Sequence, residues 1–238
     1  MNFAGILAGG KGTRMGKTDL PKQFLMLGQK PILVHTIEQF IISNYIDYIV
    51  VAVPENWINY TLDIINKYCK NDRVTVIAGG KNRNETIFNI CNYIKEKHSI
   101  SEEDIIITHD AVRPFITQRI IKDNIEKCKE IGATDTVISA TDTIVESKDN
   151  NIISNIPIRE NMYQGQTPQS FKILEFMDVS NKLTEEEKEI LTDACKIYVL
   201  KDKEVGLVEG ELFNIKVTTT YDLKMANLML NNIDNKEW

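Results

Sequence analysis

Apolar runs alternate with amphipathic segments along most of the chain, and this alternation constrains the fold more than any other feature. A strand that is buried on both faces reads as a continuous run rich in Val and Ile, and such runs are Phe3–Leu7, Tyr48–Val53, Val74–Ile77, Ile105–Thr108 and Thr136–Ser139. The segments between them have apolar residues at helical spacing, namely Ile32–Ile42, Trp57–Tyr68, Thr86–Glu96 and Gln118–Ile131. We therefore predict an α/β fold with a Rossmann-like, mostly parallel sheet flanked by helices.

Length, charge and cysteine spacing exclude several classes of protein. The chain has 238 residues without repeats or linkers, so we expect a single domain over residues 1–238. A formal charge of −6, from 28 basic and 34 acidic residues, argues against nucleic acid as a partner. The four cysteines lack C-x-x-C spacing, which argues against a zinc knuckle or a redox pair. No apolar run approaches the roughly 18 residues of a membrane span and no signal pattern is present, so we expect a soluble, cytoplasmic protein without membrane contact.

The first apolar run leads straight into a glycine-rich loop. Glycines occupy positions 9, 10, 12 and 16, and the same stretch carries Arg14, Lys17 and Lys22. Glycine lets the backbone N–H groups of a loop approach a polyphosphate closely, and the cations add electrostatic attraction. The loop therefore predicts nucleotide binding.

Three kinds of nucleotide-binding loop compete for this stretch. Gly10-x-Gly12 begins a dinucleotide-binding fingerprint, but Met15 stands where the third glycine belongs. Gly12–Thr18 ends like a Walker A loop, but it is one residue short between its glycines, and Pro21 follows where a helix should run. The third pattern is that of nucleotidyltransferases, Leu-Ala-Gly-Gly-x-Gly-x-Arg-Met followed by Pro-Lys-Gln. It fits at every position of Leu7–Met15 and Pro21–Gln23.

Further blocks extend the agreement over the chain. They are LAGGKGTRMG, LPKQF, GGKNRNETI, THDAVRPF, YQGQTPQSF, LTDACK and NIKVTT, spread from residue 7 to residue 220. In the order and spacing of these blocks the chain resembles the cytidylyltransferase family that includes methylerythritol phosphate and ribitol-5-phosphate cytidylyltransferases. The resemblance implies a nucleotidyltransferase fold that binds CTP and a small polyol phosphate and uses Mg²⁺.

The reaction implied by this resemblance brings anionic groups together. A phosphate oxygen must approach the α-phosphorus of a nucleoside triphosphate while pyrophosphate leaves, so cations must supply most of the stabilisation. We expect Arg14 and Lys22 to be catalytic, because the loop directs both toward the phosphates and the family uses both positions. Asp110 follows a strand at its carboxyl end, where ligands bind, and the resemblance implies that it holds Mg²⁺. We interpret His109 as structural, since an attacking phosphate is already deprotonated at neutral pH and needs no general base.

The resemblance also implies which residues bind CTP. The Gly79–Thr86 block, which follows a strand and leads into a helix, is assigned to the cytidine, although a glycine pair followed by Asn is also a common helix start. Arg113 either steers the triphosphate or pairs with an acidic neighbour. The expected CTP-binding residues are Leu7, Ala8, Gly9, Gly10, Gly12, Thr13, Gly80, Lys81, Asn82, Arg83, Asn84, Glu85, Thr86 and Arg113.

Two distant cations and two threonines are the candidates for positioning the acceptor phosphate. The resemblance implies that Arg159 and Lys216 hold this phosphate in line for attack. Thr167 and Thr192 match polar positions near the same site. Turn and helix-cap roles remain open for both threonines.

A segment at about residues 140–162 breaks the alternation of strands and helices. It contains two short β-prone stretches around a turn rich in Asp and Asn at residues 149–151, which predicts a hairpin that projects from the sheet. An ordinary surface hairpin is one interpretation. The resemblance implies instead a protruding β-arm that embraces a second subunit, and therefore a homodimer.

The acceptor is inferred from the amino-acid sequences of three blocks. Methylerythritol enzymes mostly read HDAARP where this chain reads HDAVRPF, and YQGQTPQSF with LTDACK resembles the ribitol phosphate branch. We therefore expect transfer of the cytidylyl group from CTP to D-ribitol 5-phosphate, giving CDP-ribitol and pyrophosphate for teichoic acid or a related polyol phosphate polymer. The alternative acceptor is 2-C-methyl-D-erythritol 4-phosphate, of isoprenoid synthesis. A non-catalytic nucleotide-binding protein is the alternative from a different class, and it would be expected to lose Arg14, Lys22 or Asp110.

Overall fold

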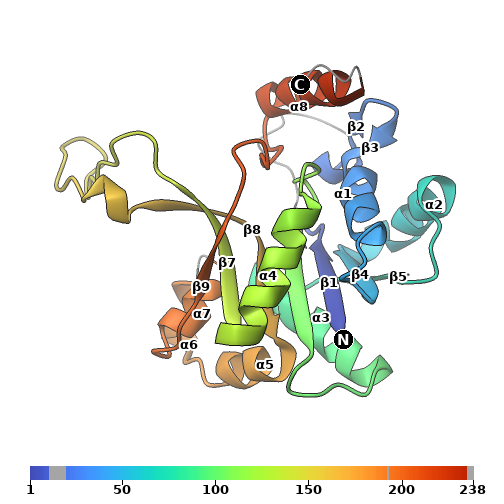
Figure 1. The fold of residues 1–238 in the computed structure, drawn as a ribbon, viewed down its shortest axis with the longest axis horizontal. Helices are drawn as coiled ribbons and strands as arrows, with labels where there is room; N and C mark the ends of the chain where they lie inside the picture. Colours follow the sequence, from blue (N-terminus) through green and yellow to red (C-terminus); the bar gives the residue numbers. More distant parts are fainter. Residues whose placement is uncertain (11–19, 192, 235–238) are drawn as a thin grey trace.

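A seven-stranded sheet runs through the computed structural model, which describes residues 1–10, 20–191 and 193–234 (Figure 1). Only the two pairings made by β8, with β6 and β7, are antiparallel, and the other neighbouring strands are parallel. The predicted mostly parallel sheet is therefore confirmed. The strand order is β5 (Val74–Ala78), β4 (Tyr48–Val53), β1 (Asn2–Leu7), β6 (Ile105–Asp110), β8 (Tyr163–Lys172), β7 (Ala133–Ser139) and β9 (Gly206–Glu209).

Helices cover both faces of this sheet (Figure 1). Among the described residues, none of the helices combines the length and the apolar character that crossing a bilayer requires. A short hairpin of β2 (Met26–Leu27) and β3 (Lys30–Pro31) precedes the first α-helix. The α-helices are α1 (Ile32–Ile41), α2 (Ile58–Tyr68), α3 (Arg83–Lys97), α4 (Gln118–Ile131), α5 (Ile173–Asn181), α6 (Glu185–Glu189), α7 (Cys195–Val199) and α8 (Thr220–Asp234), and the 3₁₀ turns are Lys22–Phe24, Glu55–Trp57 and Arg159–Asn161.

Two apolar layers, one on each face of the sheet, form most of the core, and a smaller third cluster contains Leu27, Ile32, Val112, Val217 and Ala226. In β4, Ile49 and Val51 belong to the apolar layer that includes α1, α2 and α4, whereas Val50 and Ala52 belong to the layer that includes α3, α5 and α7. Successive side chains of a strand point to opposite faces, so a central strand needs apolar residues at every position. This requirement explains why the buried strands read as continuous apolar runs.

Local capping explains where the helices begin and end. The Asn82 side chain accepts a hydrogen bond from the Glu85 N–H, so α3 begins three residues before the predicted start at Thr86. Helix α4 has the predicted bounds: it begins after the Thr117 cap and ends at Gly132, whose φ of +97° suits glycine.

Strand β8 is the interior strand of the sheet that the apolar pattern does not predict; β9, α5, α6, α7 and α8 were not predicted either. Its sequence, YQGQTPQSFK, is largely polar, yet it lies between β6 and β7 with Gln166, Thr167, Gln169 and Ser170 buried. These polar side chains are hydrogen-bonded inside the protein; the Ser170 hydroxyl, for example, bonds to the Asn124 side chain. A strand whose buried side chains are polar has no apolar run, so the apolar pattern of the sequence does not predict it.

Residues 140–162 leave the end of β7, project away from the sheet and return at the start of β8 (Figure 1). The predicted turn is present, because the Asp149 carboxylate accepts hydrogen bonds from the N–H groups of Asn151 and Ile152. The predicted β-hairpin is reduced to a single antiparallel bridge, between Glu146 and Asn155. We call residues 140–162 the excursion.

Candidate active site

A cavity of about 310 Å³ lies at the carboxyl ends of the parallel strands β1, β5 and β6. Sequence blocks that are far apart in the chain meet there, as expected for an open α/β sheet. The expected CTP-binding residues that line it are Leu7, Ala8, Gly9, Gly10, Gly80, Lys81, Asn82, Arg83 and Thr86. The other lining residues are Lys22, Asp110 and Lys216, which were expected in other roles, and Gln23, Ala111 and Val112, which were not expected at the site.

Ala8, Gly9 and Gly10 after β1, together with Lys22 and Gln23, form one wall. The Gln23 side chain donates a hydrogen bond of 2.7 Å to the Ala8 carbonyl, which ties the start of the loop to the 3₁₀ turn where Lys22 stands. A Cβ atom on Gly10 would lie 3.4 Å from Cε of Lys22, which is van der Waals contact, so Gly10 lies directly beside this lysine. Three of the predicted residues in this loop, Gly12, Thr13 and Arg14, lie outside the described residues.

The turn from β5 into α3 forms a second wall. The Gly80 N–H donates to the Thr86 hydroxyl at 2.9 Å, and the Lys81 N–H donates to the Glu85 carboxylate at 2.8 Å. A Cβ atom on Gly80 would lie 2.5 Å from Cγ of Glu85, so this position excludes a side chain. The helix-start interpretation of this block is therefore correct, and the same turn also lines the cavity, with Lys81 and Arg83 among its lining residues.

Two members of this block lie away from the cavity wall. Asn84 and Glu85 are absent from the lining, and the Oδ1 atom of Asn84 is buried without a hydrogen-bond partner among the described residues.

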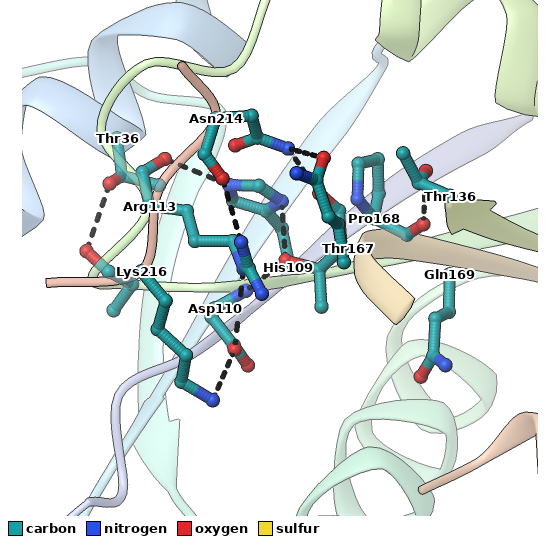
Figure 2. A network of polar contacts seen from close by, with 12 residues as sticks. Thr36, His109, Asp110, Arg113, Thr136, Thr167, Pro168, Gln169, Asn214 and Lys216 are labelled. Carbon is teal, nitrogen blue, oxygen red and sulfur yellow. Dashed lines mark hydrogen bonds and ion pairs between the residues drawn. The ribbon is translucent and has the colours of Figure 1, made fainter. Parts of the chain in front are cut away.

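Asp110, the last residue of β6, gathers three cations at the floor of the cavity. Its Oδ1 lies 2.8 Å from Nη1 of Arg83. Its Oδ2 lies 2.7 Å from Nζ of Lys216 and 3.8 Å from Nε of Arg113 (Figure 2). Burial alone would raise the pKa of Asp110, but the charges of Arg83, Lys216 and Arg113 outweigh it and hold this pKa well below the usual range. The carboxylate therefore stays ionised, and three positive charges face one negative charge.

A buried hydrogen-bond network supports Asp110 from behind (Figure 2). The Asp110 N–H donates to the Thr167 hydroxyl, which also shares a hydrogen bond of 3.0 Å with Nδ1 of His109. The other ring nitrogen of His109 lies 3.0 Å from the Arg113 carbonyl, and Nη1 of Arg113 donates to the Asn214 carbonyl. Burial lowers the pKa of His109 to about 4, so the ring is neutral, in agreement with the structural interpretation. Thr167 and Arg113 lie behind the floor rather than in the cavity lining.

The acceptor-positioning candidates fall in separate places. Lys216 lies at the cavity floor and Thr167 beneath it, whereas Thr192 lies outside the described residues. Arg159 is exposed on the excursion, where its guanidinium contacts the Thr141 carbonyl at 3.4 Å. Within one chain, the structure does not bring Arg159 to the cavity lining.

The arrangement at Asp110 also tests the expected Mg²⁺ site. No group of three or more His, Cys, Asp or Glu side chains in the described part of the chain could hold a metal ion. Both oxygens of Asp110 are already paired with cations. The residues present therefore do not fit a metal ion that protein side chains alone would hold.

Two glutamines at the site were not among the predicted residues. Gln23 stands in the LPKQF block and fixes the loop after β1. Gln169 stands in YQGQTPQSF, and its side-chain oxygen accepts a hydrogen bond of 3.0 Å from Nη2 of Arg83. The blocks carried the signal for both, but the role of Gln169 depends on the strand β8 that the apolar pattern did not predict.

Comparisons with known proteins agree with this geometry. The chain superposes on an Anaerococcus prevotii 4-diphosphocytidyl-2C-methyl-D-erythritol synthase with a TM-score of 0.80 and 25% identity, over 97% of this chain and 96% of that one. It superposes on a Francisella tularensis 2-C-methyl-D-erythritol 4-phosphate cytidylyltransferase with a TM-score of 0.79 and 28% identity, over 95% and 98%. The model of the IspD family, described as 2-C-methyl-D-erythritol 4-phosphate cytidylyltransferase, matches residues 3–232. The chain therefore belongs to the IspD family of cytidylyltransferases.

Proposed function

We propose that the protein transfers the cytidylyl group of CTP to a small polyol phosphate at the cavity around Asp110. The observation that carries this proposal is the gathering of Arg83, Lys216 and Arg113 on one carboxylate. Such a surplus of positive charge at the carboxyl ends of parallel strands favours a polyanionic substrate.

In the proposed reaction an oxygen of the acceptor phosphate forms a bond to the α-phosphorus of CTP, and the bond from this phosphorus to the bridging oxygen of pyrophosphate breaks. Lys22 and Arg14 stabilise the charge that develops on the phosphates, and Lys216 orients the acceptor phosphate. The acceptor oxygen is already deprotonated, so no general base is needed. His109 could not act as one, because it is fully buried and both of its ring nitrogens are engaged.

The proposed placement of CTP follows the two walls of the cavity. Backbone N–H groups at Gly9 and Gly10 approach the triphosphate, and the turn at Gly80 and Lys81 reads the base. Competition kinetics between CTP and UTP test this placement. Preference for CTP supports it, and equal use of UTP contradicts it.

For the acceptor, we propose D-ribitol 5-phosphate, with CDP-ribitol as the product for a teichoic acid or related polymer. The HDAVRPF, YQGQTPQSF and LTDACK blocks support this acceptor, and Val112, which departs from HDAARP, lines the cavity. The second candidate is 2-C-methyl-D-erythritol 4-phosphate. The comparisons favour this second candidate, since the matched family description and the structural neighbours name that enzyme.

A pyrophosphate-release assay with CTP and each acceptor in turn tests both candidates. A higher kcat/KM with D-ribitol 5-phosphate supports the proposal, and a higher value with methylerythritol phosphate overturns it in favour of the second candidate. Release with neither acceptor, together with tight CTP binding, would indicate a non-catalytic nucleotide-binding protein.

Members of this family commonly use a divalent metal ion, and we propose Mg²⁺, which the phosphates of CTP would hold together with Asp110. A titration of Mg²⁺ with the wild type and with Asp110→Asn tests whether Asp110 is a ligand. An unchanged metal dependence in the variant excludes this role, whereas a weakened dependence supports the role that the resemblance implies.

We also propose a homodimer in which the excursion of each subunit contacts its partner. The excursion exposes apolar side chains that a single chain leaves in solvent, namely Val145, Ile152, Ile153, Ile156 and Ile158. Burial of such side chains in a dimer is favourable, at about 25 cal/mol per Å² of apolar surface. The same contact would deliver Arg159 to the cavity of the partner subunit.

A further inference from the structure

A chain of three polar contacts leads from the cavity floor to a residue that no sequence block identifies. Nη1 of Arg83 lies 2.8 Å from Oδ1 of Asp110, and Nη2 of Arg83 donates to the side-chain oxygen of Gln169 at 3.0 Å. The side-chain nitrogen of Gln169 then donates to Oδ1 of Asp135, also at 3.0 Å. Asp135 lies on β7, away from the cavity lining.

The strands fix the geometry of this contact chain. Asp135 and Gln169 are directly opposite each other in the antiparallel pairing of β7 with β8, and the register shifts immediately afterwards, between Asp135 and Val137. Directly opposite residues of a strand pair project their side chains to the same face of the sheet. This is the face on which α3 packs, and Arg83 is the first residue of α3.

We propose that Asp135 is a positioning residue for the nucleotide site, because it orients the side-chain amide of Gln169 and this amide holds Arg83 against Asp110. This inference rests on the proposed function only in assigning Arg83 to CTP.

The chemistry of an amide explains why an anchor is needed. A glutamine side chain offers an oxygen at one position and an NH₂ group at the other, and rotation by half a turn exchanges them. In the exchanged orientation an NH₂ group would face the guanidinium of Arg83, so two donors would meet. The Asp135 carboxylate only accepts hydrogen bonds when ionised, and therefore selects the orientation in which the Gln169 oxygen faces Arg83.

The orientation of Gln169 in turn determines how the Arg83 side chain is held. Its planar guanidinium is held at two nitrogens, by Asp110 from β6 and by Gln169 from β8. Two partners in a fork geometry set the plane of the group as well as its position. Without Asp135 the orientation of the Gln169 amide is no longer fixed, and Arg83 must be ordered again whenever CTP binds.

The first test compares Asp135→Ala, Gln169→Ala and the double variant. The measurements are the CTP dissociation constant by titration calorimetry, then kcat, the KM for CTP and Tm. We expect each single variant to weaken CTP binding about tenfold, which corresponds to about 1.4 kcal/mol. We expect kcat to change much less, and the double variant to match Gln169→Ala, because both residues act through one contact chain. Additive losses, or a fall in Tm without any loss of CTP affinity, would overturn the proposal.

The second test exchanges the hydrogen-bond donor and acceptor between positions 135 and 169. Gln169→Glu places a carboxylate opposite Asp135, and we expect weaker CTP binding. Adding Asp135→Asn to this variant supplies an amide that donates to one oxygen of the introduced carboxylate, while the other oxygen accepts from Arg83. The affinity for CTP should then return to within about threefold of wild type. A combined variant no better than Gln169→Glu alone would contradict the proposal. Because calorimetry measures CTP binding directly, this result does not depend on whether either acceptor supports turnover.

Discussion

The cavity floor and the excursion differ in how far one chain completes them. At the floor, Asp110 is ion-paired through both oxygens, and the residues behind it are buried and hydrogen-bonded. In the excursion, a single β-bridge, the turn at Asp149 and the 3₁₀ turn Arg159–Asn161 are the regular structure of a segment whose apolar side chains are exposed. This difference is what the proposed homodimer predicts, in which one chain organises the nucleotide half of the site and the partner's excursion completes the acceptor half.

The largest expected effect is at the wall of the cavity. Lys22→Ala should lower kcat by about two orders of magnitude or more with little change in Tm, because the residue stabilises charge that develops in the transition state. Steady-state kinetics and thermal unfolding measure the two effects. Lys17→Ala, in the same loop, is the matched control and should keep most of the activity. Near-normal turnover of Lys22→Ala would remove Lys22 from the catalytic role.

The next prediction joins the two regions by mixing two inactive variants, Arg159→Ala and Lys22→Ala. If Arg159 acts on the partner's cavity, each heterodimer has one site with both wild-type residues. Random exchange makes about half of the dimers heterodimers, so about a quarter of wild-type activity should return. Each variant alone is the control. If Arg159 acted on the cavity of its own chain, every site would lack one cation, and mixing would restore nothing.

A smaller effect is expected when the excursion alone is changed. Ile152→Glu should weaken dimerisation about tenfold or more, because a charge replaces an apolar side chain in the proposed contact. Asn151→Glu adds the same charge at the neighbouring exposed position and should have little effect. Sedimentation over a concentration series measures both. Equal dissociation constants for the two variants would argue against apolar docking of the excursion, while Tm should stay near wild type in both.

The smallest effect concerns stability and pH near the cavity floor. Burial, together with the nearby Asp193 carboxylate, raises the pKa of Asp135 to about 6. Between the usual carboxyl pKa and about 6 the folded protein binds a proton that the unfolded chain does not, so this group's contribution to stability falls as pH rises through that range. Asp135→Asn lacks this loss and should be more stable than wild type at pH 7, by about 1 kcal/mol, with the difference disappearing below about pH 4. Denaturant unfolding across this range measures it, and a difference that does not change with pH would contradict the raised pKa.

Much of the fold and half of the site could be predicted from sequence. The strands near Leu7, Ala78 and Asp110 carry continuous apolar runs, so their carboxyl ends, and the loops that follow them, could be placed together before the structure was known. Lys22 and Lys81 could be placed in the cavity for the same reason, since each follows one of these ends within a recognisable block.

The remaining features depend on residues whose roles arise only from contacts. Nothing in the sequence around Arg113 decides between a phosphate and an acidic partner, and the structure places its Nε 3.8 Å from Asp110. Gln169 could not be assigned either, because a polar strand has no periodic signal and its partners lie on β7 and α3.

By itself, the sequence determined the elements whose causes are local. Apolar periodicity set the parallel strands, the Thr117 cap and Gly132 set the ends of α4, and Asp149 set the turn of the excursion. Only the tertiary structure decided that β8 inserts antiparallel between β6 and β7, and that Asp110 meets Lys216 from the far end of the chain. Periodicity and capping act over a few residues, whereas ion pairs and strand insertion depend on which distant segments the packed sheet brings together.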